Sequence, residues 1–342
     1  MPDYDAFLLL SFGGPEGPDD VLPFLENVTR GRGVPPERLA EVAGHYYAFG
    51  GVSPINAQSR QILEAARESF DAAGLRLPAY WGNRNWQPYL TDTVREMGRA
   101  GVRRAIAFTT SAYTSYSSCR QYLDDIERAR AEAGPDAPVI DKIRPYYDRP
   151  GFIEPFARAT RAAIGSLPAD VRDGARLVFT AHSIPLGMAA TSGSVSAGTA
   201  VAAPGGRYRA ELADAAGRIA KLAGREHAWD LVFQSRSGPP SVPWLEPDVC
   251  DHLRDLAKRG EEAVVVVPVG FVTDHMEVLH DLDTEAAEVA ESLGLAFARA
   301  ATPGHEPEFT AMITELVQEA IAAPEGPSCP GDCCRYQPRR SA

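Results

Sequence analysis

The chain has 342 residues, of which 44% are hydrophobic and 23% charged, and it carries a formal net charge of −12. This length allows one large domain or two domains of ordinary size, and the composition is typical of a soluble globular protein. The acidic balance argues against a general nucleic-acid-binding protein, because phosphate backbones are bound mainly through lysine and arginine, but it leaves room for a local basic pocket. The sequence has no run of roughly 18 apolar residues and no basic, cleavable leader, so we expect a cytoplasmic protein.

Short apolar runs alternate with helix-like segments along most of the chain. Between the first two runs, Ile62, Ala66 and Phe70 recur on one helical face, and Gly74 favours a helix stop. Eight runs are predicted to be strands, four in each half of the chain: 6–11, 78–83, 104–110, 139–146, 176–183, 230–236, 263–271 and 295–300.

This alternation predicts an α/β protein with two Rossmann-like lobes, each built on a four-stranded parallel sheet flanked by helices. We expect the lobes at residues 1–150 and 151–323, followed by a tail at 324–342. The last helix either closes the second lobe or packs back on the first. Because ligands of open α/β sheets bind where strands end, the cleft between the lobes is the expected site.

Two stretches depart from the pattern. Residues 187–206, "GMAATSGSVSAGTAVAAPGG", follow a strand end and are predicted to be either a mobile loop over the cleft or a solvated insertion. The tail has too little apolar content to fold by itself, yet it contains "CPGDCC". Three close thiols in a cytosolic chain indicate a metal before a disulfide.

The ends of the predicted strands differ in the chemistry they offer. The first opens onto "SFGGPEGPDD", which lacks the features of a phosphate-binding loop or a dinucleotide fingerprint, so no nucleotide cofactor is expected. The fifth ends at His182, which is either a structural or a catalytic histidine, depending on what faces it. After the sixth, Gln234, Arg236 and Trp244 are candidates for the rim of a flat aromatic ligand site, with a simple loop anchor as the alternative for Trp244.

After the seventh strand, "VVVVPVGFVTDHMEVLHDLD" changes abruptly from valines to acidic residues. If a helix begins near Asp274, then Asp274, Glu277, Asp281 and Glu285 form one acidic stripe. One interpretation is a solvated face with Asp274 as the N-cap. The other is a path for a divalent cation or for protons, in which at least one of the crowded carboxylates has a raised pKa.

Five motifs, in order along nearly the whole chain, resemble the ferrochelatase family. They are "LLLSFGGPEGPDDVLPFL", "GGVSPIN", "AHSIP", "QSRSGPPSVPWLEP" and "GFVTDHMEVLHDLD". Together with "SYSSCRQYLDDI" the chain is most similar to the actinobacterial type, which acts on coproporphyrin III. The resemblance implies two lobes holding a porphyrin, insertion of Fe²⁺ and release of two pyrrole protons in haem biosynthesis.

Three other functions stay open beside this one. They are a protoporphyrin IX ferrochelatase, a related chelatase that inserts cobalt into another tetrapyrrole, and a non-catalytic two-lobed carrier of metal or haem. The cobalt relatives are typically built around paired histidines, whereas this cleft offers His182 with Glu277, which favours iron. A carrier would have no use for a base facing a carboxylate.

The resemblance also implies roles for individual residues. His182 is similar to the family histidine that binds iron or takes a pyrrole proton, and Glu277 to the carboxylate that faces it. Asp274, His275 and Asp281 correspond to a track for iron or protons behind them. Candidate porphyrin contacts are Phe12, Arg30, Arg32, Ser53, Arg84, Tyr122 and Trp244.

Phe12 departs from the pattern of some coproporphyrin enzymes, which carry a product-ligating tyrosine at this place. Phenylalanine cannot ligate iron, so that contact is absent or replaced here. The arginines are candidates for binding propionates, because guanidinium groups pair with carboxylates through two hydrogen bonds.

The tail thiols resemble the C-terminal ligands of ferrochelatases that carry a [2Fe-2S] cluster, which requires four cysteines. Cys329, Cys333 and Cys334 would supply three, and Cys119 the fourth, with Cys250 as the alternative. A reduced tail or adventitious zinc is the competing interpretation. We further expect a monomer, with transient contacts to neighbouring haem-pathway enzymes.

Overall fold

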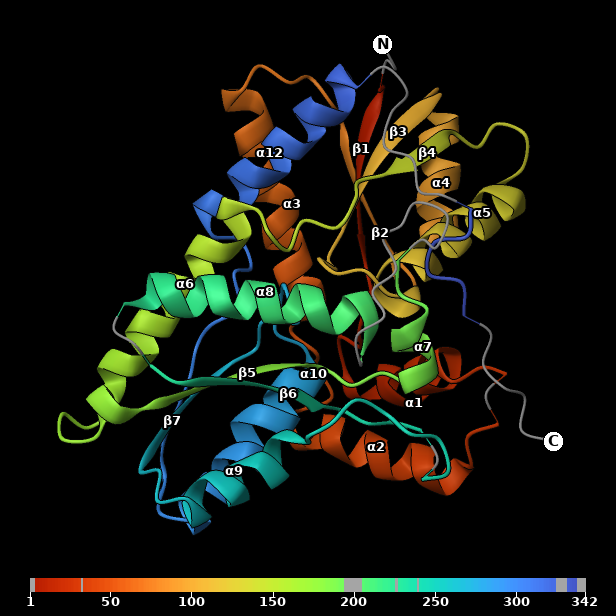
Figure 1. Ribbon diagram of the computed structural model, residues 1–342. Helices are drawn as coiled ribbons and strands as arrows, with labels where there is room; N and C mark the ends of the chain where they lie inside the picture. Colours follow the sequence, from red (N-terminus) through yellow and green to blue (C-terminus); the bar gives the residue numbers. More distant parts are fainter. Residues whose placement is uncertain are drawn as a thin grey trace.

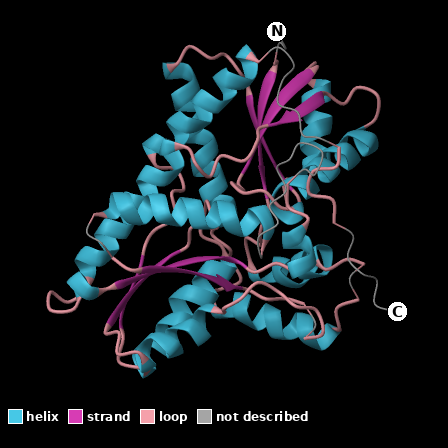
Figure 2. Ribbon diagram, viewed as in Figure 1, coloured by secondary structure: helices cyan, strands magenta, loops and turns pink. Residues whose placement is uncertain are grey.

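The computed structural model describes residues 4–31, 33–193, 205–224, 227–238, 240–323 and 331–336. Within these residues the chain forms two four-stranded sheets, each flanked by helices, as Figures 1 and 2 show. All strand pairings in both sheets are parallel. The predicted fold class is therefore confirmed.

The first sheet has the strand order β2-β1-β3-β4. Its strands are β1 (Ala6–Ser11), β2 (Ala79–Asn83), β3 (Arg104–Thr109) and β4 (Val139–Lys142). Every residue of β1 is buried, because helices cover both faces of the sheet, which explains its unbroken apolar sequence.

The second sheet repeats this arrangement in the order β6-β5-β7-β8. Its strands are β5 (Arg176–His182), β6 (Trp229–Gln234), β7 (Ala263–Val267) and β8 (Ala296–Arg299). The prediction that β7 runs to residue 271 is wrong by four residues. Pro268 has no N–H to donate to a neighbouring strand, so the ladder ends before it.

In Figure 1, α3, α4 and α5 lie beside the first sheet, whereas α1 and α2 lie toward the second sheet. In α3, Ile62, Ala66 and Phe70 are buried as the periodicity predicts, and Gly74 follows with φ +70°. The segments are α1 (Pro18–Val28), α2 (Pro36–Ala48), α3 (Ile55–Ala72), α4 (Leu90–Arg99), the π-helix η1 (Tyr116–Arg120) and α5 (Gln121–Ala133).

The second half of the chain supplies the remaining helical segments. They are α6 (Pro150–Ser166), the 3₁₀ turn η2 (Arg172–Gly174), α7 (Leu186–Ala190), α8 (Gly206–Ala223), α9 (Val249–Lys258), α10 (Met276–His280), the π-helix η3 (Asp281–Ala286), α11 (Ala287–Ser292) and α12 (Pro307–Ala322).

The two lobes share one continuous core. The last helix, α12, lies against α3 of the first lobe as well as against α6, and the hydroxyls of Ser69 and Thr314 are 2.6 Å apart (Figure 1). Beyond the ends of β3 and β7, the Tyr113 hydroxyl donates to the carbonyl of Val269 at 2.8 Å. These contacts fix the strand ends of one lobe relative to those of the other.

The two irregular stretches are described in part. The beginning of 187–206 belongs to α7, and 194–204 lie outside the described residues. Of the tail, residues 331–336 are described. Among the described helices, none is both long and apolar enough to span a bilayer.

Candidate active site

His182 and Glu277 meet at the carboxyl edge of the second sheet. His182 is the last residue of β5, and Glu277 lies in the first turn of α10, which follows β7, the neighbour of β5. His182 Nε2 is 3.6 Å from Glu277 Oε1. The Nδ1 of His182 bonds to the carbonyl of Ser183, so Nε2 is the nitrogen presented to the carboxylate. We call these two residues the inner pair.

The two members of the inner pair shift each other's protonation in opposite directions. Burial disfavours the charged imidazole, but the charge and hydrogen bond of Glu277, together with the Ser183 carbonyl and the charge of Asp281, outweigh burial and raise the pKa of His182 to about 9. Burial likewise disfavours the carboxylate, but His182 outweighs it and lowers the pKa of Glu277 to about 2. At neutral pH the inner pair is therefore an imidazolium facing a carboxylate.

His275 holds the start of α10. Its Nδ1 accepts a hydrogen bond from the N–H of Glu277 at 3.2 Å, and its ring packs edge-on against Phe271. Burial lowers the pKa of His275, so the ring is neutral at pH 7. The prediction that Asp274 is the N-cap is wrong, because the cap is His275.

Asp274 has other partners. Its carboxylate pairs with Arg299 at 3.2 Å and accepts from the hydroxyl of Thr302 at 3.2 Å. Arg299 in turn pairs with Asp283. The predicted acidic stripe is therefore divided, because its first member is neutralised by an arginine while the later members face one another.

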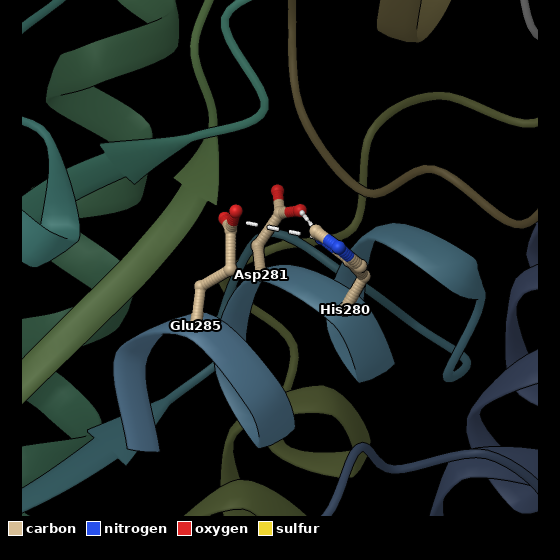
Figure 3. A group of neighbouring side chains, drawn as sticks. All are labelled: His280, Asp281 and Glu285. Carbon is tan, nitrogen blue, oxygen red and sulfur yellow. Dashed lines mark hydrogen bonds and ion pairs between the residues drawn. The ribbon is translucent and has the colours of Figure 1, made fainter. Parts of the chain in front are cut away.

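The last two members of the stripe, Asp281 and Glu285, form a second group with His280. His280 Nδ1 lies 3.4 Å from Asp281 Oδ1 and 3.8 Å from Glu285 Oε2, and the three side chains converge as Figure 3 shows. The chain is π-helical from Asp281, so the predicted single α-helix is wrong here. We call His280, Asp281 and Glu285 the outer triad. Its ligand atoms lie within 4.8 Å of one another, a spacing that could hold a metal ion.

The carboxylate of Asp281 is bound from β6 as well as from its own helix. The Ser235 hydroxyl and, at 3.4 Å, the Gln234 amide donate to its Oδ2. Burial and next the charge of Glu277 raise the pKa of Asp281 to about 6. The expectation that one crowded carboxylate has a raised pKa is met at this residue.

The first lobe reaches the outer triad through a histidine of α2. The rings of His45 and His280 are stacked, with centroids 3.7 Å apart and planes 7° from parallel. Burial, followed by the charge of His280, lowers the pKa of His45. Sequence reasoning missed this contact, because His45 lies 235 positions from His280 and in no motif.

Several predicted porphyrin contacts lie near the strand ends. The Trp244 ring is tilted against His182 at 6.5 Å between centroids, which places it beside the inner pair. Ser53 is buried, and its N–H donates to the carbonyl of Pro15 in the loop after β1. The Phe12 ring packs edge-on against Phe24.

The predicted arginines have different surroundings. Arg84 is buried and pairs with Asp125 at 2.5 Å, with its guanidinium over the rings of Phe12 and Tyr122. Its charge is thus already matched by a carboxylate. Arg30 is exposed after α1, and Arg32 lies outside the described residues.

Two of the predicted cluster cysteines lie close together in the described part of the tail. Cys333 Sγ and Cys334 Sγ are 3.6 Å apart, and the Gly193 N–H donates to Cys334 Sγ at 3.3 Å. Cys329 lies outside the described residues.

Cys119 and Cys250 have different surroundings. Cys119 is buried in η1, where the neighbouring Tyr116 packs against Tyr336 of the tail at 6.1 Å between centroids. Cys250 lies in α9 beside Asp248 and Glu285, and its pKa is raised to about 12 by burial and by those charges. The segment that carries Cys119 thus contacts the tail through Tyr116 and Tyr336.

A two-lobed α/β fold carries an imidazole-carboxylate pair at one strand edge, continued by an imidazole-carboxylate triad whose ligand atoms could hold a metal ion. The family model for ferrochelatase matches residues 4–321. The chain belongs to the ferrochelatase family.

Similar proteins agree with this assignment. The chain is 55% identical to a coproporphyrin III ferrochelatase of Nocardia farcinica, over 99% of this chain and 98% of the relative. It is 51% identical to one of Streptomyces coelicolor, over 100% and 98%. It is 48% identical to a ferrochelatase of Rhodopirellula baltica, over 99% and 96%.

The fold alone is shared with a solved structure of SirB from Bacillus subtilis with Fe³⁺. The TM-score is 0.52 at 13% identity, and the match covers 93% of this chain and 95% of that chain.

Proposed function

We propose that this ferrochelatase inserts Fe²⁺ into coproporphyrin III and that the inner pair carries the reaction. The mechanism is supported most by the 3.6 Å distance between His182 Nε2 and Glu277 Oε1 and by the opposite shifts of their pKa values. The substrate is proposed from the names of relatives at 51% and 55% identity. Two steps follow from the geometry, the capture of iron and the removal of pyrrole protons.

Capture of iron begins with a proton exchange. Metals bind neutral imidazole, so Fe²⁺ must displace the proton that Glu277 holds on His182 Nε2, and this proton leaves to solvent. The metal then takes the place of that proton between the same two groups. One imidazole and one carboxylate bind Fe²⁺ less tightly than a closed thiolate cage would, which suits a metal that must be passed on.

Removal of pyrrole protons follows once the metal moves to the macrocycle. His182, again next to Glu277, recovers its high pKa and can accept one N–H proton. Asp281, with a pKa of about 6, is suited to accept or relay the second. The pair thus alternates between holding a proton and holding a metal.

The outer triad is the proposed approach for iron. A pocket of about 440 Å³ opens between α9 and α11, and Glu285 lies in its lining together with Asp248 and Cys250. Glu285 therefore belongs both to the outer triad and to a pocket of the surface. Iron entering there would pass Asp281 before it reaches Glu277.

Substrate choice is tested by anaerobic Fe²⁺ insertion with coproporphyrin III and with protoporphyrin IX, followed by the shift of the Soret band. We expect a preference for coproporphyrin III, whose four propionates offer more groups for basic and hydroxyl side chains than the two of protoporphyrin IX. Equal or better turnover of protoporphyrin IX would contradict the proposed substrate. Better insertion of Co²⁺ than of Fe²⁺ would favour the cobalt chelatase.

We also propose a [2Fe-2S] cluster bound by Cys119, Cys329, Cys333 and Cys334. The separation of Cys333 and Cys334 suits this group, since two thiolates on one tetrahedral metal with bonds of about 2.3 Å lie roughly 3.7 Å apart. The N–H of Gly193 directed at Cys334 Sγ is the kind of hydrogen bond that tunes cluster sulfurs. When bound, the group would supply one-electron redox chemistry and hold the tail against η1.

The cluster is tested with protein purified anaerobically. We expect a coloured protein with the absorption of a [2Fe-2S] centre, lost in Cys119→Ser and kept in Cys250→Ser. A colourless protein that contains zinc would favour adventitious zinc, and one free of metal would favour a reduced tail. The cytoplasmic location and the monomeric state stay predictions, the second of which sedimentation can test.

A further inference from the structure

Ser235, directly after β6, has a backbone conformation that serine rarely adopts. Its φ is +60°, in the left-handed region that glycine occupies without cost. The strand end before it is held firmly, because the Gln234 carbonyl accepts from the N–H of Ser183 at 2.8 Å. A left-handed backbone conformation at a residue other than glycine indicates that the side chain has a role there.

The Ser235 side chain bonds to another element rather than to its own turn. Its hydroxyl donates to Asp281 Oδ2, across 46 positions of sequence. Gln234 acts alongside it, donating to the main-chain carbonyl of Glu277 at 3.0 Å and to Asp281 Oδ2 at 3.4 Å. The end of β6 thus binds Glu277 of the inner pair and Asp281 of the outer triad, which lie one turn apart.

These bonds determine which oxygen of Asp281 is left for other partners. With Oδ2 engaged by Ser235 and Gln234, Oδ1 is the oxygen that lies toward His280 Nδ1. Without a donor on Oδ2, the carboxylate would be free to rotate, and its neighbours Glu277 and Glu285 both repel it.

We propose that Ser235 is a positioning residue for metal transfer, which orients Asp281 so that the outer triad and the inner pair form a continuous path for a divalent cation. This inference rests on the proposed function, since it concerns how the same ion reaches His182. Serine is required because a hydroxyl must be offered from this backbone position, and glycine, which suits the backbone better, has none.

The test compares Ser235→Ala and Ser235→Gly with Ser237→Ala, a control at an exposed position of the same loop. Loss of a hydrogen bond to a charged group corresponds to about a tenfold change in affinity. In both Ser235 variants we therefore expect the KM for Fe²⁺ to rise about tenfold, while kcat and the KM for coproporphyrin III stay within about twofold. Ser237→Ala should match the wild type.

A second measurement needs no porphyrin. Calorimetric titration with Zn²⁺ should show binding weakened by a similar factor in both Ser235 variants. If the wild type inserts no iron into either porphyrin, the proposed function fails, whereas this titration still decides the role of Ser235.

The glycine variant separates the hydroxyl from the backbone. Because glycine relieves the left-handed conformation, a purely conformational role would leave Ser235→Gly unimpaired and affect only Ser235→Ala. That result would overturn the proposal. So would wild-type Zn²⁺ affinity in both variants, or a parallel rise in the KM for porphyrin.

Discussion

The inner pair and the outer triad use the same kinds of side chain in different electrostatic settings. In the inner pair one carboxylate faces one imidazole, so the pKa values separate to about 9 and about 2. In the outer triad two carboxylates share one imidazole with Glu277 nearby, and the pKa of Asp281 rises to about 6. Burial raises the pKa of Asp281 most, and the charge of Glu277 adds to it, whereas in the inner pair each charged group stabilises the other.

The largest expected effect comes from removing the imidazole of the inner pair. His182→Ala should lower the rate of iron insertion by about 10³-fold, because both a metal ligand and a proton acceptor are lost. Porphyrin binding, followed by fluorescence quenching, should stay within a few-fold of the wild type. The exposed His305→Ala is the control, and turnover that survives in His182→Ala would refute the assigned role.

Removing the carboxylate of the inner pair should change the pH dependence of metal binding. Below pH 9 the wild type binds Zn²⁺ more tightly as pH rises, because the metal competes with a proton on His182. In Glu277→Gln the carboxylate that raises the pKa of His182 is absent, so the increase of Zn²⁺ affinity with pH should end at a lower pH. The affinity reached should be about 10²-fold weaker, since one charged contact of roughly 3 kcal/mol is lost. Identical pH profiles would contradict the pairing, and the exposed Glu262→Gln is the control.

A smaller effect is expected in the outer triad. Asp281 ionises above a pKa of about 6, so its contribution to iron capture is lost as pH falls through that value. Asp281→Asn should raise the KM for Fe²⁺ about tenfold at pH 7.5 and remove this acidic limb. The control Asp255→Asn, at an exposed position of α9, should do neither. An acidic limb unchanged in Asp281→Asn would assign it to another group.

The smallest effect is on thermal stability. His182 has a raised pKa, so its contribution is complete below pH 6.5 and is lost as pH rises through 9. Glu277 has a lowered pKa, so its contribution is present above pH 4.5 and is lost as pH falls through 2. The Tm of the wild type minus that of Glu277→Gln should therefore be largest between pH 4.5 and 6.5. Outside this range the difference should fall by about 2–5 °C. A difference independent of pH from 5 to 9 would argue against the ion pair.

Much of the fold followed from local patterns, because parallel strands buried on both faces have continuous apolar sequences. The sheet edges that carry His182 and Glu277 followed from the same patterns. The family resemblance then supplied the expectation that the two residues face each other.

The structure differs from the sequence-based predictions where tertiary contacts override the local pattern. The stripe from Asp274 assumed regular α-helical spacing, whereas the chain becomes π-helical at Asp281 and Arg299 binds Asp274. The left-handed Ser235 and the stack of His45 on His280 depend on contacts between distant segments. No periodicity in one sequence encodes such contacts.

The central claim is that Glu277 keeps a proton on His182 until a metal displaces it. Proton release on Zn²⁺ binding to porphyrin-free protein, measured at pH 7.5 in weak buffer, tests this most directly. With the pKa of His182 at about 9, the wild type should release close to one proton per metal bound from this residue, and His182→Ala should release none from it. Equal release by the two proteins would show that His182 is already neutral, and would contradict the account.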